Sequence, residues 1–213
     1  MNTEKLYLVG DIIDLWALKR NWFWPTETNE IIRIIFKFSD TIPLIYVIGN
    51  HDELLRFLVG YQFGNLKICR ETEHQLIDGN KLLVIHGDAF DIVIQNAHWL
   101  GVLGSYAYDY LVILNMWVNR VRTFFGRPYW SLAGYLKAKV KDAGSFIEKF
   151  EKLVTDEARR KNCQGVVVGH IHVPAIKTIN QILYMNIGDM VDSCTVLVED
   201  LEGNFSHVYL SKR

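Results

Sequence analysis

The stretch LIYVIGNHD, residues 44–52, is an apolar strand that ends in a turn of polar residues. Its run of branched and aromatic side chains predicts a buried strand, and Gly49 lets the chain turn sharply at the end of it. Asn50, His51 and Asp52 follow at once. Polar groups at the carboxyl end of a buried strand predict an α/β sheet whose loops converge on a ligand.

Three other apolar strands are followed by acidic residues or histidines in the same way: Asp11 after LYLVG (6–10), His86 and Asp88 after LLVI (82–85), and His170 and His172 after VVVG (166–169). A single histidine beside a strand is more often a structural residue. Asp, Asn and His together at four strand ends are hard to explain by core packing. Carboxylate and amide oxygens mixed with imidazole nitrogens suit Mn²⁺, Fe²⁺ or Zn²⁺, so the pattern predicts a divalent-metal site.

The rest of the chain alternates short apolar runs with helical segments, which predicts an α/β fold with parallel strands first and hairpins late. The expected strands span 6–10, 43–52, 79–90, 165–174, 181–189, 194–200 and 205–212. Helices are expected at 29–38 and 52–60. From Asp91 to about Arg160 there is no strand signal, and the amphipathic segment 136–161 predicts a long helix.

Composition narrows the class of protein. A chain of 213 residues, half of them hydrophobic, suits one globular domain rather than a disordered segment. The 23 basic and 24 acidic residues nearly cancel, so no basic excess argues for nucleic acid. The three cysteines form no CxxC pair and the N-terminus has no signal-peptide pattern, so we expect a reducing, cytoplasmic setting.

The most membrane-like stretch spans residues 98–122 and is long and aromatic. Asp109, Asn115 and Asn119 interrupt it. Because a central Asp is expensive in hydrocarbon, we expect helices buried in the protein or lying at a lipid surface rather than a membrane span.

Four motifs occur in order, each at a strand end: Gly-Asp-x-x-Asp (10–14), Gly-Asn-His-Asp (49–52), His-Gly-Asp (86–88) and Gly-His-x-His (169–172). Together they resemble the calcineurin-like metallophosphoesterases. Further stretches, YWSLAGYLKAKVKDAGSFIEKFE (129–151) and MNIGDMVDSCTVLVE (185–199), are similar to the bacterial group named after UDP-2,3-diacylglucosamine pyrophosphatase. The resemblance covers nearly the whole chain. It implies a single domain over 1–213, folded as a four-layer α/β/β/α sandwich with a helical insertion at about 92–160.

The resemblance also implies a metal centre. Asp11 would bridge two divalent ions, with Asn50, His86 and His170 completing one site and His172 belonging to the other. The ion would be Mn²⁺, with Fe²⁺, Zn²⁺ or Mg²⁺ as alternatives. Two adjacent ions clamp a phosphoryl group and lower the pKa of a bridging water, so the chemistry of the residues agrees with the resemblance.

His51 would be the catalytic imidazole near the leaving-group oxygen, and Asp14 would orient it. A carboxylate that holds a histidine in one tautomer is a common arrangement around metals. Lys137, Lys139 and Lys141 alternate with apolar residues inside the insertion. Most such charge runs are solvated faces; the alternative is that these lysines contact a substrate phosphate.

Other polar residues have simpler interpretations. Asp52 and Asp88 each follow a turn, so bonding to the backbone is favoured over a place around the metal. Asp189 is equally compatible with a structural and a functional role. His74 and His207 lie in polar contexts and are expected at the surface.

One departure from the family concerns the second metal. In the family, a strand ending Asp-x-His supplies ligands to the ion that His172 also holds. No Asp-x-His precedes Gly10, so one site is complete and the other keeps only Asp11 and His172. We therefore expect either an N-terminally shortened chain or a relative that holds one metal or is inactive.

The expected function is metal-dependent hydrolysis of a phosphodiester or pyrophosphate bond. The resemblance implies a lipid-linked or nucleotide-linked substrate such as UDP-2,3-diacylglucosamine, a role in lipid A biosynthesis and peripheral contact with the inner membrane face. His51 stands where those pyrophosphatases commonly carry Arg, which places the chain in a broader group of the family.

The aromatic segment 92–146 would be either a lid over the metal site or an ordinary helical core. The alternatives are a scaffold protein of the same fold and a soluble phosphodiesterase or phosphatase with a non-lipid substrate; the oligomeric state stays open.

Overall fold

The computed structural model describes residues 3–21, 24–90, 117, 120–122, 142–191 and 193–210. The chain divides into two compact units, one made of Met1–Ala89 and Glu151–Arg213 and the other of Phe90–Phe150. All the strands among the described residues belong to the first unit. The candidate site residues that the structure describes belong to it as well.

The first sheet has the strand order β1-β2-β4-β3. Its strands are β1 (Leu6–Val9), β2 (Leu44–Val47), β3 (Gln62–Phe63) and β4 (Leu66–Cys69). β1, β2 and β4 run parallel, whereas β3 pairs with β4 in the antiparallel sense. Val9, Val47 and Cys69 stand in one row, so the three parallel strands end at the same edge of the sheet.

The second sheet has the order β5-β6-β7-β9-β8. Its strands are β5 (Glu71–Gln75), β6 (Lys81–Ile85), β7 (Gly165–Val168), β8 (Ala175–Ile179) and β9 (Ile182–Asn186). β6, β7 and β9 are parallel, with Val84, Val167 and Met185 in one row. A separate antiparallel hairpin is formed by β10 (Thr195–Glu199) and β11 (Phe205–Tyr209).

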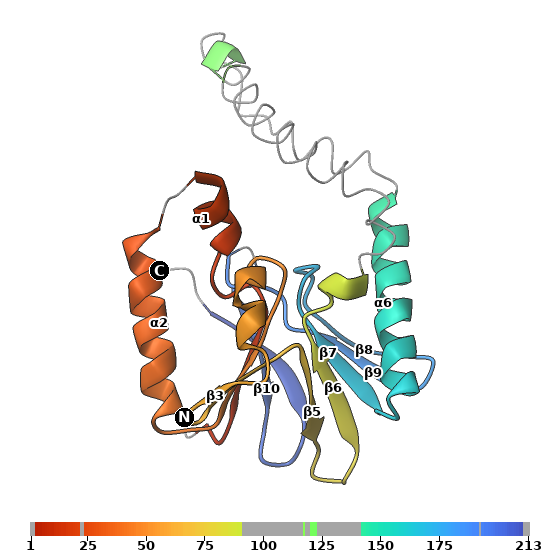
Figure 1. Ribbon diagram of the computed structural model, residues 1–213. Coiled ribbons are helices and arrows are strands. Elements are labelled where there is room, and N and C mark those ends of the chain that lie inside the picture. The colour runs from red at the N-terminus through yellow and green to blue at the C-terminus, as the bar shows by residue number, and fades with distance from the viewer. Residues whose placement is uncertain are drawn as a thin grey trace. The chain divides into compact units, whose positions relative to one another are not determined.

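The helices among the described residues are α1 (Leu15–Asn21), α2 (Thr26–Ser39) and α6 (Asp142–Arg160), with short 3-10 helices η1 (Glu53–Leu58) and η2 (Asp88–Phe90). α2 is amphipathic and buries Ile35 against Leu44, Tyr46 and Ile48 of the first sheet. Figure 1 shows α2 on the outer side of the strands of this unit. No described helix is both long and apolar enough to span a membrane.

The core lies between the two sheets. Alternate residues of a strand point to opposite faces, so Tyr46 faces α2 while its neighbour Val47 packs with Val84, Val167 and Met185 of the second sheet. The part of α6 that belongs to the first unit begins at Glu151, whose carboxylate lies 2.7 Å from the ammonium of Lys177 on β8. The layers are therefore helix, sheet, sheet and helix, and the predicted α/β/β/α sandwich is confirmed.

Several elements were missed by the sequence patterns. β4 and β5 occupy residues 66–75, where no strand is predicted, and α1 is also unexpected. β5 reads ETEHQ and is an edge strand, so its side chains are polar and give no apolar signal. The long helix expected over 136–161 appears as α6. The remainder of the helical insertion lies outside the described residues, except for residues 117 and 120–122, which are helical.

Candidate metal centre

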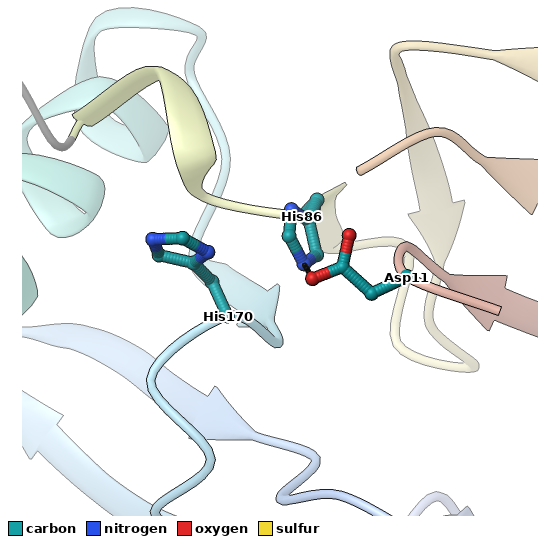
Figure 2. A group of neighbouring side chains, drawn as sticks. All are labelled: Asp11, His86 and His170. Atoms are coloured by element: carbon teal, nitrogen blue, oxygen red, sulfur yellow. Dashed lines mark ion pairs between the residues drawn. The ribbon is translucent and has the colours of Figure 1, made fainter. Parts of the chain in front are cut away.

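Asp11, His86 and His170 meet at the carboxyl ends of β1, β6 and β7, and Figure 2 shows the three side chains side by side. Each residue offers a ligand atom, and these atoms lie within 4.8 Å of one another. His86 Nε2 is 3.3 Å from Asp11 Oδ2. The rings of His86 and His170 are perpendicular, with centroids 5.0 Å apart. One carboxylate and two imidazoles at this spacing can share a single cation.

Asn50 supplies a further acceptor beside this cluster. Its side-chain oxygen is buried and accepts no hydrogen bond from the described residues. The preceding residue, Gly49, lies so close to Asp11 and His86 that a Cβ there would overlap the Asp11 carboxylate. A buried amide oxygen without a donor costs free energy. An acceptor without a donor, one residue after the glycine that lies against Asp11, fits coordination of a cation, which needs an acceptor and no proton.

The backbone is strained at the residues that carry these groups. Asp11, His170 and His172 have φ values of 55°, 64° and 56°, in the left-handed region that residues with a Cβ rarely adopt. Each such residue costs about 1–3 kcal/mol and persists only where its surroundings hold it. Strained residues at the ends of β1 and β7, among the proposed ligands, are typical of a binding site.

The electrostatics of the cluster also favour a cation. Burial lowers the pKa of His86, but the Asp11 and Asp88 carboxylates outweigh burial and raise that pKa to about 9. Burial raises the pKa of Asp11, but its contacts with His86 and the His51 backbone outweigh burial and hold it below the usual value. Two carboxylates thus stabilise one positive charge between them. The donor set, the unmet oxygen of Asn50 and this charge balance all fit a divalent metal ion.

His51 and Asp14 lie at the rim of the same site. His51 Nδ1 is 3.1 Å from Asp14 Oδ1, and the backbone N–H of His51 donates to Asp11 Oδ1 at 2.8 Å. Trp16 stacks on the imidazole with centroids 4.5 Å apart. The ring is therefore held from two sides, and its side chain remains 38% exposed. A proton on Nδ1, held by Asp14, leaves Nε2 as the nitrogen available to a substrate.

Asp52 ties two ligand-bearing turns together. Its carboxylate is buried and accepts hydrogen bonds from Gly49 N at 2.6 Å, Ile12 N at 3.1 Å and the Tyr46 hydroxyl at 2.7 Å. Burial and the nearby carboxylate raise the pKa of Tyr46 well above its ordinary value. The backbone bonding expected of Asp52 is present. The link from the turn after β1 to the turn after β2 could not be found from the sequence, because the partners are 40 residues apart.

The sequence did not predict any role at the site for Asn186, which lies at the end of β9. It is fully buried, donates from Nδ2 to Gly169 O at 2.8 Å and accepts from Gly188 N at 2.9 Å. His207 Nε2 lies 2.7 Å from the Asn186 carbonyl, so the expectation that His207 is a surface residue is wrong. Asn186 thereby fixes the peptide that precedes His170. The only signal for it was a polar residue that closes the strand ILYMN.

His74 was also expected at the surface, and this too is wrong. Its Nδ1 is 2.9 Å from the Tyr7 hydroxyl and its Nε2 is 2.6 Å from Glu199 Oε2, which links β5 to β1 and β10. Burial and the Glu199 charge raise the pKa of Tyr7 to about 12.

Asp189 binds the backbone and hydroxyl of Ser193, which gives Asp189 a structural role in its own loop.

The remaining predicted residues are placed differently. Asp88 Oδ1 is 3.4 Å from His86 Nδ1, so Asp88 contacts the cluster through His86. His172 is exposed and does not join the three-residue cluster found among the described residues. Lys137, Lys139 and Lys141 lie outside the described residues.

The chain is similar to several known proteins. The chain is 25% identical over 186 residues to UDP-2,3-diacylglucosamine hydrolase of Klebsiella pneumoniae, covering 81% of this chain and 70% of the relative. It is 25% identical over 210 residues to the enzyme of that name from Shewanella frigidimarina, covering 92% and 79%. A solved archaeal phosphodiesterase aligns with a TM-score of 0.40 at 13% identity, covering 84% of this chain and 76% of that one. The family model for calcineurin-like phosphoesterases matches residues 2–174, and the chain belongs to that family.

Proposed function

We propose that Asp11, Asn50, His86 and His170 hold a divalent cation, and that the chain hydrolyses a phosphodiester or pyrophosphate bond there. The observation that supports this most directly is the cluster of one carboxylate and two imidazoles, together with the buried oxygen of Asn50, which accepts no hydrogen bond from the described residues. Mn²⁺ is the proposed ion, because mixed oxygen and nitrogen donors suit it. We also propose His172, in its left-handed conformation, as a ligand for a second cation that shares Asp11.

A cation bound here would polarise a phosphoryl oxygen and lower the pKa of a bound water. The chain itself contributes the groups that move and hold protons. His51 would protonate the leaving-group oxygen from Nε2 while Asp14 keeps the proton on Nδ1. Asp52 and Asn186 would keep the ligand-bearing turns in position. A scaffold protein would need neither the His51–Asp14 pair nor the Trp16 ring that holds it.

For the substrate we propose a lipid-linked or nucleotide-linked phosphate ester, in keeping with the names of the two bacterial relatives. The segment that follows the His51 turn exposes five large apolar side chains: Leu54, Phe57, Val59, Tyr61 and Phe63. Such a surface suits an acyl chain or the face of a membrane. A lid formed by residues 92–146, and phosphate contacts from Lys137, Lys139 and Lys141, stay predictions.

The test uses the full chain loaded with Mn²⁺. Bis(p-nitrophenyl) phosphate and micellar UDP-2,3-diacylglucosamine are the two substrates, and metal content is measured in the same samples. We expect Mn²⁺-dependent turnover of both, with the lipid substrate preferred. Turnover of the aryl diester alone would support the soluble phosphodiesterase instead. Full metal content with no turnover of either would contradict the proposal and favour a scaffold.

A further inference from the structure

An open cavity of about 330 Å³ is lined by Arg56, Val59 and Arg70. Arg56 belongs to η1, which begins directly after the turn that carries Asn50 and His51. Arg70 is the first residue after β4, the strand that pairs with β2. The cavity therefore lies at the carboxyl edge of the first sheet, where ligands of parallel sheets bind.

Arg70 has donor capacity that the described residues leave unmet. Its Nη1 is buried and has no hydrogen-bond acceptor among them. The nearest acidic atom to Nη2 is Asp88 Oδ2 at 3.8 Å, which is too long for a hydrogen bond. The side chain as a whole is 36% exposed, so part of it is accessible to a ligand. Leaving a charged donor unpaired is unfavourable, which makes Arg70 a good partner for an incoming anion.

Arg56 is paired, but weakly. Its Nη1 lies 2.7 Å from Glu53 Oε1 on the same short helix, and both side chains are about half exposed. Exposed ion pairs of this kind contribute little to stability. Arg56 can therefore exchange Glu53 for an anionic ligand at little cost in free energy. The described residues that line the cavity include two guanidinium groups and no acid.

The cavity is adjacent to the candidate metal centre. β5 pairs with β6 so that Glu71 stands opposite Ile85, which brings Arg70 next to His86 across the two strands. Asp88 joins them, since its carboxylate lies 3.4 Å from His86 Nδ1 and 3.8 Å from Arg70 Nη2. A substrate with one phosphate at His86 can therefore reach the arginines with another part of the same molecule.

We propose that Arg56 and Arg70 form an anion subsite that binds a second anionic group of the substrate, a phosphate or carboxylate that is not itself hydrolysed. The planar guanidinium fork suits both groups, because it donates two parallel hydrogen bonds. The substrate would then carry at least two anionic groups, one at the metal centre and one in the cavity. This inference rests on the proposed function, because it assumes that the hydrolysed phosphate lies at His86.

The kinetic test compares two substrates with the same leaving group: thymidine 5′-(p-nitrophenyl phosphate) and its 3′-phosphorylated form. In the Mn²⁺-loaded chain the second phosphate should lower KM about ten- to hundredfold, the usual effect of a charge-assisted hydrogen bond. Arg56→Gln and Arg70→Gln should remove most of that preference and leave kcat for the simpler substrate within about threefold. Arg70→Lys, which keeps the charge but not the fork, should retain part of it.

The matched control is Arg33→Gln. Arg33 on α2 also pairs with an acid three residues away, Glu30, and is exposed, so its loss removes the same kind of ion pair at a residue that does not line the cavity. The control should keep the full preference. Equal KM values for the two substrates in the unsubstituted chain, or an unchanged preference in both Gln variants, would overturn the subsite.

A second measurement separates this inference from the proposed function. Calorimetric titration of inorganic phosphate into the Mn²⁺-loaded chain should show one more bound phosphate than the Arg56→Gln, Arg70→Gln double variant at equal metal content. This result supports the subsite even if neither aryl substrate is hydrolysed, which would count only against the proposed function. Equal phosphate stoichiometry in the two proteins would refute the subsite.

Discussion

His86 and His74 lie in the same unit, and each lies close to a carboxylate, yet the two surroundings differ. His74 makes contacts of 2.9 Å with Tyr7 and 2.6 Å with Glu199, so both ring nitrogens have close partners. His86 lies 3.3 Å from Asp11 and 3.4 Å from Asp88, and its Nδ1 has no hydrogen bond among the described residues. The His74 contacts are short and complete, whereas those of His86 are long and incomplete.

The backbone differs in the same direction. His74 and Tyr7 belong to regular strands, but Asp11 and His170 have left-handed φ angles at the ends of theirs. A satisfied network on regular backbone joins parts of the fold. Unmet polar atoms of His86 and Asn50, close to the strained backbone of Asp11, mark a place that binds something. The chemistry of a histidine is therefore decided less by its neighbouring carboxylate than by whether the local contacts are already complete.

The largest expected difference between the two regions comes from His86→Ala. Because this change removes a proposed ligand, metal content should fall sharply and turnover should become undetectable. Elemental analysis of the purified variant, with His74→Ala as the control, checks it. Full metal occupancy in His86→Ala would remove His86 from the metal centre and erase the contrast with His74.

The next effect is expected from His51→Ala. If His51 protonates the leaving group, turnover should fall by about 10²–10⁴-fold. Metal content should stay close to that of the unsubstituted chain, since the hydrogen bond from His51 to Asp11 comes from the backbone N–H, which alanine keeps. Parallel assays of turnover and metal content decide the matter; loss of metal would show that His51 is a ligand instead.

A smaller effect is expected from Asn186→Ala, which leaves every proposed ligand in place. The Gly169 carbonyl would lose its donor, and the peptide before His170 would lose its anchor. Groups that orient a metal ligand typically contribute about 10- to 100-fold in metal affinity. Competition with a fluorescent chelator measures the change. A variant that melts at a lower temperature but keeps its metal affinity would limit Asn186 to a structural role.

The smallest effect on activity is expected from His74→Ala. Breaking the link between Tyr7 and Glu199 should lower the free energy of unfolding by about 1–3 kcal/mol, the range for a buried hydrogen-bonded group left without its partner. Metal content and turnover below the melting temperature should not change. Urea unfolding curves give the loss of stability. A fall in metal affinity would mean that the two regions are coupled and that the contrast between them is too simple.

The sequence predicted those parts of the site that are local in the chain. Asp11, Asn50, His86 and His170 each follow an apolar strand, and parallel strands end at one edge of their sheet. The pattern predicted a metal site at these strand ends, and the resemblance to the family implied that Asp11, His86 and His170 meet there although they follow strands of two different sheets. The alternation of apolar strands and helices predicted an α/β fold, and the resemblance to the metallophosphoesterases implied the four-layer sandwich.

The contacts that the sequence did not reveal join residues far apart in the chain. Asp52 bonds to Ile12 across 40 residues, and His74 bonds to Glu199 across 125. No local pattern distinguishes a buried acid that binds backbone from an exposed one. β5 was missed for a related reason: its polar side chains match an edge strand only once its neighbour β6 is known.

The left-handed conformation of Asp11, His170 and His172 restricts which amino acids can replace them. Asp, Asn and His tolerate this conformation better than other residues with a Cβ, and they are also the residues that bind metals through oxygen or imidazole. Backbone shape and ligand chemistry therefore select from the same short set of side chains. Glu or Gln could offer a similar oxygen, but each would fit the backbone less well, so attempts to redesign the metal preference at these three positions have few substitutions to choose from.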